Sequence, residues 1–170
     1  MKTYFLIITL TLLTLTCCRG DEEDTQIIDQ VLMLYVNNSA GQDMLNSTID
    51  GSYSSVALVD LLDVTALKAI SGQTFPKDAD NVVYMDYPAG AIRLLKNEVT
   101  TDSEEKIYYS NFIIRYFKII NSVSTLSSQD TIKIEYSWKP SLFQISKLWY
   151  NDELKFTKVP GQRNVVKIVK

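Results

Sequence analysis

A strict alternation of apolar and polar residues between positions 131 and 138 constrains the fold more than any other feature of this sequence. Every second position is apolar, and the apolar members are Ile132, Ile134, Tyr136 and Trp138. Because successive side chains of a β-strand point to opposite faces, this period of two predicts a strand with one buried face. We expect Trp138 to continue that buried face.

Further short strands are predicted downstream of this segment. Residues 143–150 form the next one, and Asn151-Asp152 is a suitable two-residue hairpin turn because both residues tolerate the left-handed conformation. Leu154 and Phe156 mark the return strand. Residues 159–162 predict a turn, and residues 164–170 predict a closing strand.

Upstream, residues 107–120 are rich in aromatic and aliphatic side chains and predict a long central strand, bent near Arg115. Residues 82–87 and 91–95 flank a Pro-Ala-Gly turn and predict a strand, a turn and a second strand. Residues 100–105 are acidic and predict a loop.

The first half of the chain is ambiguous. Residues 56–62 fit a strand, which we favour, but their continuation to Gly72 also fits the spacing of a helix with a glycine stop. Residues 27–36 carry the same ambiguity. The pattern as a whole predicts an all-β domain. We expect an antiparallel β-sandwich, immunoglobulin-like or related, with one short helix in the first half as an alternative.

The composition excludes several classes of function. The chain contains no histidine, which excludes serine triads, cysteine–histidine pairs and imidazole metal ligands. Its net charge is −3, and it lacks the basic patch that nucleic-acid binding requires. We therefore expect no nucleic-acid partner, no cofactor and no metal. The only cysteines, Cys17 and Cys18, are adjacent, so we expect no disulfide within the folded domain.

The amino-terminal residues predict export. Lys2 precedes an apolar stretch at residues 4–16, which has the layout of a secretory signal and is too short to span a bilayer comfortably. We expect residues 1–17 to be a signal peptide. Residues 18–24 would then be a lipidated cysteine with an acidic tether, and residues 25–170 a single domain.

Leu15-Thr16-Cys17-Cys18 resembles the lipobox of bacterial lipoproteins. The resemblance implies that the sulfur of Cys18 carries a diacylglycerol thioether, with Leu15 at the aliphatic position. Cys17 is the alternative, and it would place Thr14 there. The resemblance also implies three acyl chains, palmitate among them, which would give near-permanent anchoring.

The acidic run at residues 21–24 resembles the surface-export signal of Bacteroidetes-type lipoproteins. It implies an outer-membrane protein exposed at the cell surface. Its alternatives are a solvated spacer and an anchor that faces the periplasm. Residues 36–46 and the segment Trp149-Tyr150-Asn151-Asp152 are similar to segments of small uncharacterised lipoproteins of the same type. That family implies no activity.

Several residues are candidates for a site. Trp149 and Tyr150 are adjacent on a strand and must face opposite ways, so we expect one of them to be exposed as a platform for a glycan or an anchor for a protein partner. Residues 78–81 place oxygen ligands at alternate positions, but they lack the glycine and the downstream glutamate of a calcium loop, and we favour an ordinary polar loop. Thr131, in Asp130-Thr131-Ile132, resembles an acceptor for bacterial O-glycosylation.

These observations predict a lipid-anchored envelope protein with a non-enzymatic domain that binds a glycan or a protein. A purely structural envelope lipoprotein is one alternative. A hydrolase that uses two carboxylates is the other, because 20 acidic residues include many potential pairs.

Overall fold

The computed structural model describes residues 25–64, 68–96 and 105–170. Within these residues every regular element is a β-strand, so the predicted all-β class is confirmed. Residues 55–60 form a strand, and the helix considered for this region is wrong over its described part. The same residues contain no helix long and apolar enough to cross a membrane. The signal segment, Cys17, Cys18, the acidic run and most of the loop at 100–105 lie outside the described residues.

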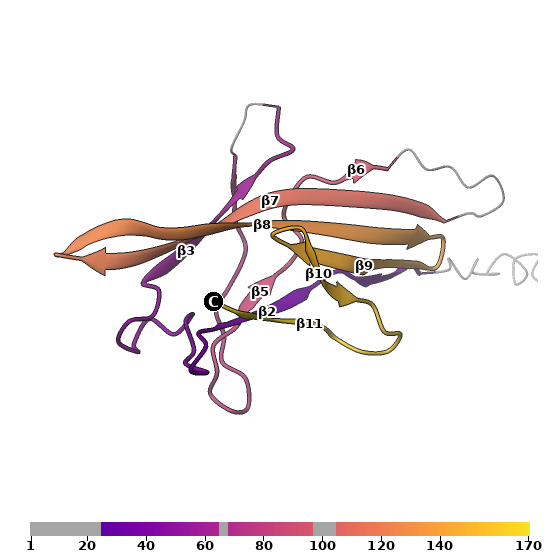
Figure 1. Ribbon diagram of the computed structural model, residues 1–170. Helices are drawn as coiled ribbons and strands as arrows, with labels where there is room; N and C mark the ends of the chain where they lie inside the picture. Colours follow the sequence, from indigo (N-terminus) through magenta and orange to yellow (C-terminus); the bar gives the residue numbers. More distant parts are fainter. Residues whose placement is uncertain (1–24, 65–67, 97–104) are drawn as a thin grey trace, which may run out of the picture.

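The described strands form a large sheet and a small one (Figure 1). The large sheet contains β1 (Ile27–Asp29), β3 (Ser55–Asp60), β4 (Ala69–Ile70), β6 (Leu94–Leu95), β7 (Lys106–Ile120), β8 (Val123–Lys139), β9 (Leu142–Tyr150) and β10 (Glu153–Thr157). The small sheet contains β2 (Leu32–Asn37), β5 (Met85–Tyr87) and β11 (Asn164–Val169).

Both sheets are mixed, which corrects the expectation of a purely antiparallel arrangement. The order in the large sheet is β1-β9-β8-β7-β3-β4, and β1 runs parallel to β9. In the small sheet, β11 runs parallel to β2. Tight turns force the antiparallel direction only on strands that are close in sequence. The strands of each parallel pair are more than 100 residues apart, so no hairpin fixes their relative direction.

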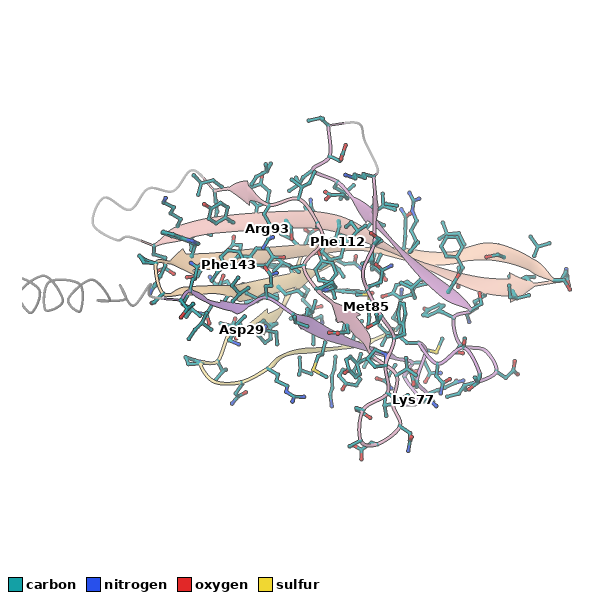
Figure 2. All side chains as sticks on the ribbon, turned by 180° about the vertical axis from the view of Figure 1, so that it is seen from behind. Asp29, Lys77, Met85, Arg93, Phe112 and Phe143 are labelled. Carbon is teal, nitrogen blue, oxygen red and sulfur yellow. The ribbon has the colours of Figure 1, made fainter. Side chains whose placement is uncertain are left out.

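The core lies between the two layers. The inner face of the large sheet contributes Phe112, Ile114, Ile132, Ile134 and Tyr136, all without exposed surface. The facing side of the small sheet contributes Leu32, Leu34, Met85 and Tyr87, which are equally buried. The rings of Tyr87 and Phe112 lie 4.9 Å apart between their centroids and join the layers. Figure 2 labels Phe112 on the large sheet and Met85 on the small sheet.

Strands β7 and β8 form the longest hairpin of the structure, and its outer end extends beyond the rest of the described chain (Figure 1). The two residues at the turn, Asn121 and Ser122, have φ values of 49° and 64°, as a tight hairpin turn requires. At about 3.3 Å per residue, the fifteen residues of β7 span about 50 Å. We call residues 117–129 the distal hairpin.

The carboxy-terminal strands agree closely with the prediction. Asn151 and Asp152 form the turn between β9 and β10, with φ values of 48° and 64°. Near Arg115, the ladder between β7 and β8 shifts register between Tyr116 and Phe117, and the extra residue lies in β8; the bend expected in residues 107–120 stays a prediction.

Three expectations need correction. The run at residues 27–36 is divided between two sheets, because the chain leaves β1 and enters β2 at Gln30 and Val31. The two strands predicted at residues 82–87 and 91–95 are shorter than expected, as β5 and β6, and they belong to different sheets. Trp138 is half-buried rather than part of the core: it lies one residue before the end of β8, with Lys106 Nζ 4.8 Å from its ring centroid.

Candidate functional site

Trp149 and Tyr150, the predicted aromatic pair, lie on opposite faces of β9. Tyr150 points into the core, is 5% exposed, and donates a hydrogen bond to Asp130 Oδ2 at 2.6 Å. Trp149 is half-buried on the opposite face, with Lys133 Nζ 5.2 Å from its ring centroid. A ligand outside the large sheet can therefore reach Trp149 but not the ring of Tyr150. Trp149 stays a predicted contact residue.

Tyr150 belongs to a polar cluster around Asp130. Asn151 Nδ2 donates to Asp130 Oδ1 at 2.7 Å, and Lys170 Nζ forms an ion pair with Asp130 Oδ2. The hydroxyls of Tyr150 and Tyr116 lie 2.9 Å apart and share a hydrogen bond. Only 10% of the Asp130 side chain and 19% of the Lys170 side chain are exposed. The cluster ties β8, the β9–β10 turn and the segment after β11 together.

Burial and hydrogen bonding act in opposite directions on the protonation of this cluster. Burial raises the pKa of Asp130, but hydrogen bonds from Lys170, Tyr150 and Asn151 outweigh it, and the pKa lies below its ordinary value. Burial raises the pKa of Tyr150 and that of Tyr116 above their ordinary values. At neutral pH the cluster therefore contains an ionised carboxylate and two protonated hydroxyls. These hydrogen bonds and the ion pair hold the three segments together, so we assign the cluster a structural role.

Thr131 lies next to this cluster. Its side chain is exposed, and its backbone N–H donates to Asn151 Oδ1 at 2.8 Å. The expectation that it marks the start of a strand is wrong, because β8 begins eight residues earlier. The predicted glycosylation of Thr131 stays a prediction, and its position is accessible.

A hollow lies beside the small sheet and has a volume of about 250 Å³. Its lining combines apolar, charged and aromatic side chains. The lining residues are Asp29, Val31, Met33, Tyr84, Asp86, Arg163 and Asn164. Figure 2 labels Asp29, where β1 ends and the chain crosses towards the small sheet. We call this feature the Asp29 hollow.

Asp29 is held in place by two neighbours. Lys158 Nζ contacts Asp29 Oδ2 at 2.5 Å, and Asn164 Nδ2 donates to Asp29 Oδ1 at 2.8 Å. The Lys158 side chain is only 6% exposed, and its ammonium also donates to Asn164 Oδ1 at 2.9 Å and to the carbonyl oxygen of Gln162 at 2.6 Å. A buried ammonium with three partners and an oriented carboxylate make this wall of the hollow rigid.

Tyr84, Asp86 and Arg163 also line the hollow. Tyr84 packs against Tyr35, with ring centroids 5.4 Å apart. Asp86 exchanges two backbone hydrogen bonds with Thr74, at 3.1 and 2.8 Å, which fixes the strand that carries it. Arg163 is exposed. These residues thus offer an aromatic ring, a carboxylate and a guanidinium to a ligand that enters the hollow.

The loop at residues 78–81 folds on its own carboxylate. Asp78 Oδ1 accepts hydrogen bonds from the N–H groups of Asp80 and Val82, both at 2.9 Å, and Tyr35 donates to Asp78 Oδ2 at 3.1 Å. The hydrogen bond from Val82 and that from Tyr35 lower the pKa of Asp78, against the effect of burial. This geometry agrees with the ordinary polar loop that we favoured.

No sequence pattern identified the Asp29 hollow. Its charged residues are 57 and 77 positions apart along the chain, at Asp29, Asp86 and Arg163. They come together only because β1, β5 and the segment before β11 meet at one end of the small sheet. The sequence offered no signal for it: Val31 is one apolar residue in a predicted strand, and its 48% exposure is visible only in the folded chain.

The predicted anchoring cysteines lie outside the described residues, but the structure places the strand that follows them. Ile27 pairs with Leu142, at the start of β9, and β8 ends three residues earlier, at Lys139. Lys106, at the start of β7, pairs with Trp138 at the same end of the sheet. The chain thus enters the large sheet at the end opposite the tip of the distal hairpin.

Comparison with models of protein families, with curated proteins and with solved structures gives no match for this chain.

Proposed function

We propose that this protein is an exported, lipid-anchored, non-enzymatic binding module whose Asp29 hollow takes a saccharide. The observation that carries the proposal is the composition of the hollow. The lining combines the apolar side chains of Val31 and Met33 and the ring of Tyr84 with two carboxylates and a guanidinium. A sugar ring has an apolar face and a rim of hydroxyl groups that both donate and accept hydrogen bonds, so it suits such a lining.

The size of the hollow favours a single ring or the end of a glycan. Sites for small molecules usually have volumes of about 300–1,000 Å³, and this hollow, at about 250 Å³, is slightly smaller. The rigid wall built by Asp29, Lys158 and Asn164 supports binding without rearrangement, because its hydrogen bonds are already formed.

The hydrolase alternative receives less support from the same geometry. A glycosidase places two carboxyl groups on either side of the scissile bond. Asp29 and Asp86 both line the hollow, but each oxygen of Asp29 accepts a hydrogen bond from a protein side chain. Binding rather than bond cleavage is therefore the function we propose for this pair.

Saccharide binding is tested with residues 25–170, which contain all eleven described strands and the whole core cluster. A glycan array identifies the ligand, and titration calorimetry measures its affinity for variants. We expect Tyr84→Ala and Arg163→Met each to weaken binding by about tenfold or more, equal to about 1.4 kcal/mol. Trp149→Ala, on the large sheet, tests the alternative contact residue predicted from the sequence, and it should bind as the parent does because the hollow lies elsewhere.

Two results would contradict this assignment. The absence of any bound glycan on the array would remove the proposed ligand class. Loss of binding in Trp149→Ala with retention in Tyr84→Ala would move the site to the aromatic residue predicted from the sequence.

The anchor is tested in the full-length chain by cysteine replacement. We expect Cys18→Ser to shift the protein from the membrane fraction to the soluble fraction, because the sulfur that carries the acyl chains is lost. Cys17→Ser should leave it in the membrane fraction. Fractionation followed by mass spectrometry of the amino terminus measures both. A double variant that still sediments with membranes would refute the anchor.

A further inference from the structure

The distal hairpin has a backbone edge that no described strand covers. The ladder between β8 and β9 begins at Ile132, which pairs with Tyr150, and only one backbone hydrogen bond extends it, from Asn151 N–H to the carbonyl oxygen of Thr131. On this side, residues 123–129 have no strand partner within the part of the chain that the structure describes. Their other side pairs with β7.

This edge lacks most of the features that usually protect exposed strands. Natural edge strands are blunted by charged side chains, prolines or strong bulges. Residues 119–129 contain no charged residue, no proline and no glycine. One bulge is present, where the ladder shifts register opposite Tyr116 and Phe117, and it leaves Val123–Leu126 as the regular part of the edge.

Both faces of the distal hairpin also expose aliphatic side chains. Ile119 is 59% exposed, Ile120 52%, Val123 61% and Leu126 48%. Ile120 pairs with Val123 on one face of the hairpin. Leu126 pairs with Phe117 on the opposite face. A ribbon of two strands is marginal in water unless a further strand or layer covers it. A strand that pairs with this edge would shield these aliphatic groups from solvent. It would also give hydrogen-bond partners to the free backbone N–H and C=O groups.

We propose that the free edge of β8 at Val123–Leu126 pairs antiparallel with the same edge of a second copy of this chain. In a twofold arrangement a residue near the axis lies opposite its own copy, so a charged residue there would meet a like charge, and an uncharged segment avoids this repulsion. The edge meets this condition, since Ser124 and Thr125 bring hydroxyl groups and Val123 and Leu126 bring aliphatic groups.

The position of the hairpin leaves room for the partner. Its tip lies clear of the small sheet and of β9 and β10 (Figure 1), and the chain enters the large sheet at the opposite end. Two copies joined at their tips therefore keep their bodies apart. The contact is short, so it forms a weak dimer that a shared membrane surface would strengthen by raising the local concentration.

Analytical ultracentrifugation of residues 25–170 over a wide concentration range is the first test. We expect a reversible monomer–dimer equilibrium. Thr125→Lys places two like charges near the twofold axis and should raise the dissociation constant by at least about tenfold. Thr48→Lys, on an exposed loop, is the matched control and should leave the equilibrium unchanged.

A second test uses the absence of cysteine from residues 25–170. Ser124→Cys, Thr125→Cys and Leu126→Cys are oxidised one at a time, and at least one should give a disulfide-linked dimer, because residues paired across strands lie within disulfide range. Thr48→Cys should remain monomeric. A monomer at every concentration with no cross-linked dimer would overturn the proposal. The proposal would also be overturned if the monomer bound to lipid vesicles by the tip of the distal hairpin and sedimented with them. The aliphatic groups would then face a bilayer and not a second copy.

Discussion

Phe112→Ala is expected to lower the free energy of unfolding by about 3–5 kcal/mol, the range observed when a large aromatic side chain is removed from a packed core. Phe112 has no exposed surface and contacts Tyr87 across the two layers, with ring centroids 4.9 Å apart. The substitution would leave a cavity where the large sheet meets the small one. Urea unfolding of residues 25–170, followed by tyrosine and tryptophan fluorescence, measures the change.

Phe75→Ala is the matched control for this prediction. The Phe75 side chain is 38% exposed, so the same atoms are removed without a buried cavity, and a loss of about 1 kcal/mol or less is expected. Equal losses in the two variants would show that the contact between the layers does not dominate stability.

Asp130→Asn is expected to lower the free energy of unfolding by about 2–3 kcal/mol at pH 7. The carboxylate accepts hydrogen bonds from Tyr150 and Asn151 and pairs with Lys170, whose ammonium also lies 4.1 Å from the ring centroid of Tyr116. Replacing the carboxylate with an amide leaves the mostly buried ammonium of Lys170 without its counter-charge. It also places an amide N–H₂ group, which is itself a donor, next to the groups that donate to the carboxylate. Asp80→Asn, on an exposed loop, makes the same chemical change and should cost less than about 0.5 kcal/mol.

The effect of Asp130→Asn should also depend on pH. The pKa of Asp130 in the folded protein lies below its ordinary value of 3.8, so the folded state binds this proton less readily than the unfolded state does. The stabilisation from the carboxylate is therefore complete above that ordinary value and decreases as the pH falls through the folded pKa. Urea unfolding at pH 7 and at pH 3 should show a smaller difference between the parent and Asp130→Asn at pH 3. A difference that grows on acidification would contradict the role assigned to Asp130.

Local sequence patterns predicted the elements that are governed by near neighbours. The alternation at residues 131–138 lies within β8, and Asn151-Asp152 forms the turn that joins β9 and β10. The closing segment at 164–170 agrees with β11 within one residue. These features depend on side-chain periodicity and on backbone preferences, and a few consecutive residues determine both.

The outer half of β8 was missed because its pattern is polar. Residues 124–129 contain four hydroxyl side chains and a glutamine, and nothing in them resembles a buried strand. They are extended because β7 supplies a complete hydrogen-bonding partner on one side. Pairing with β7 therefore determines the conformation of residues 124–129 against their polar composition. The proposed self-association uses part of this same segment.

The candidate site could not be predicted either, for a related reason. Sequence reasoning selected Trp149 and Tyr150 as adjacent aromatic residues, and the structure turns Tyr150 towards Asp130 in the interior. The Asp29 hollow joins residues from β1, β5 and the segment before β11, which no local motif connects.

The sequence by itself determined that the described chain is built of strands, where its last turns fall, and that the chemistry of histidine is absent. Those properties follow from the order and identity of nearby residues. Only the tertiary structure decided that β1 and β11 pair in parallel and that Val123–Leu126 keeps an open edge. Likewise, only the folded chain brings Asp29, Asp86 and Arg163 around one hollow. The physical reason is that hydrogen bonding between distant strands, and the packing of one sheet on another, are contacts between residues that the linear order leaves far apart.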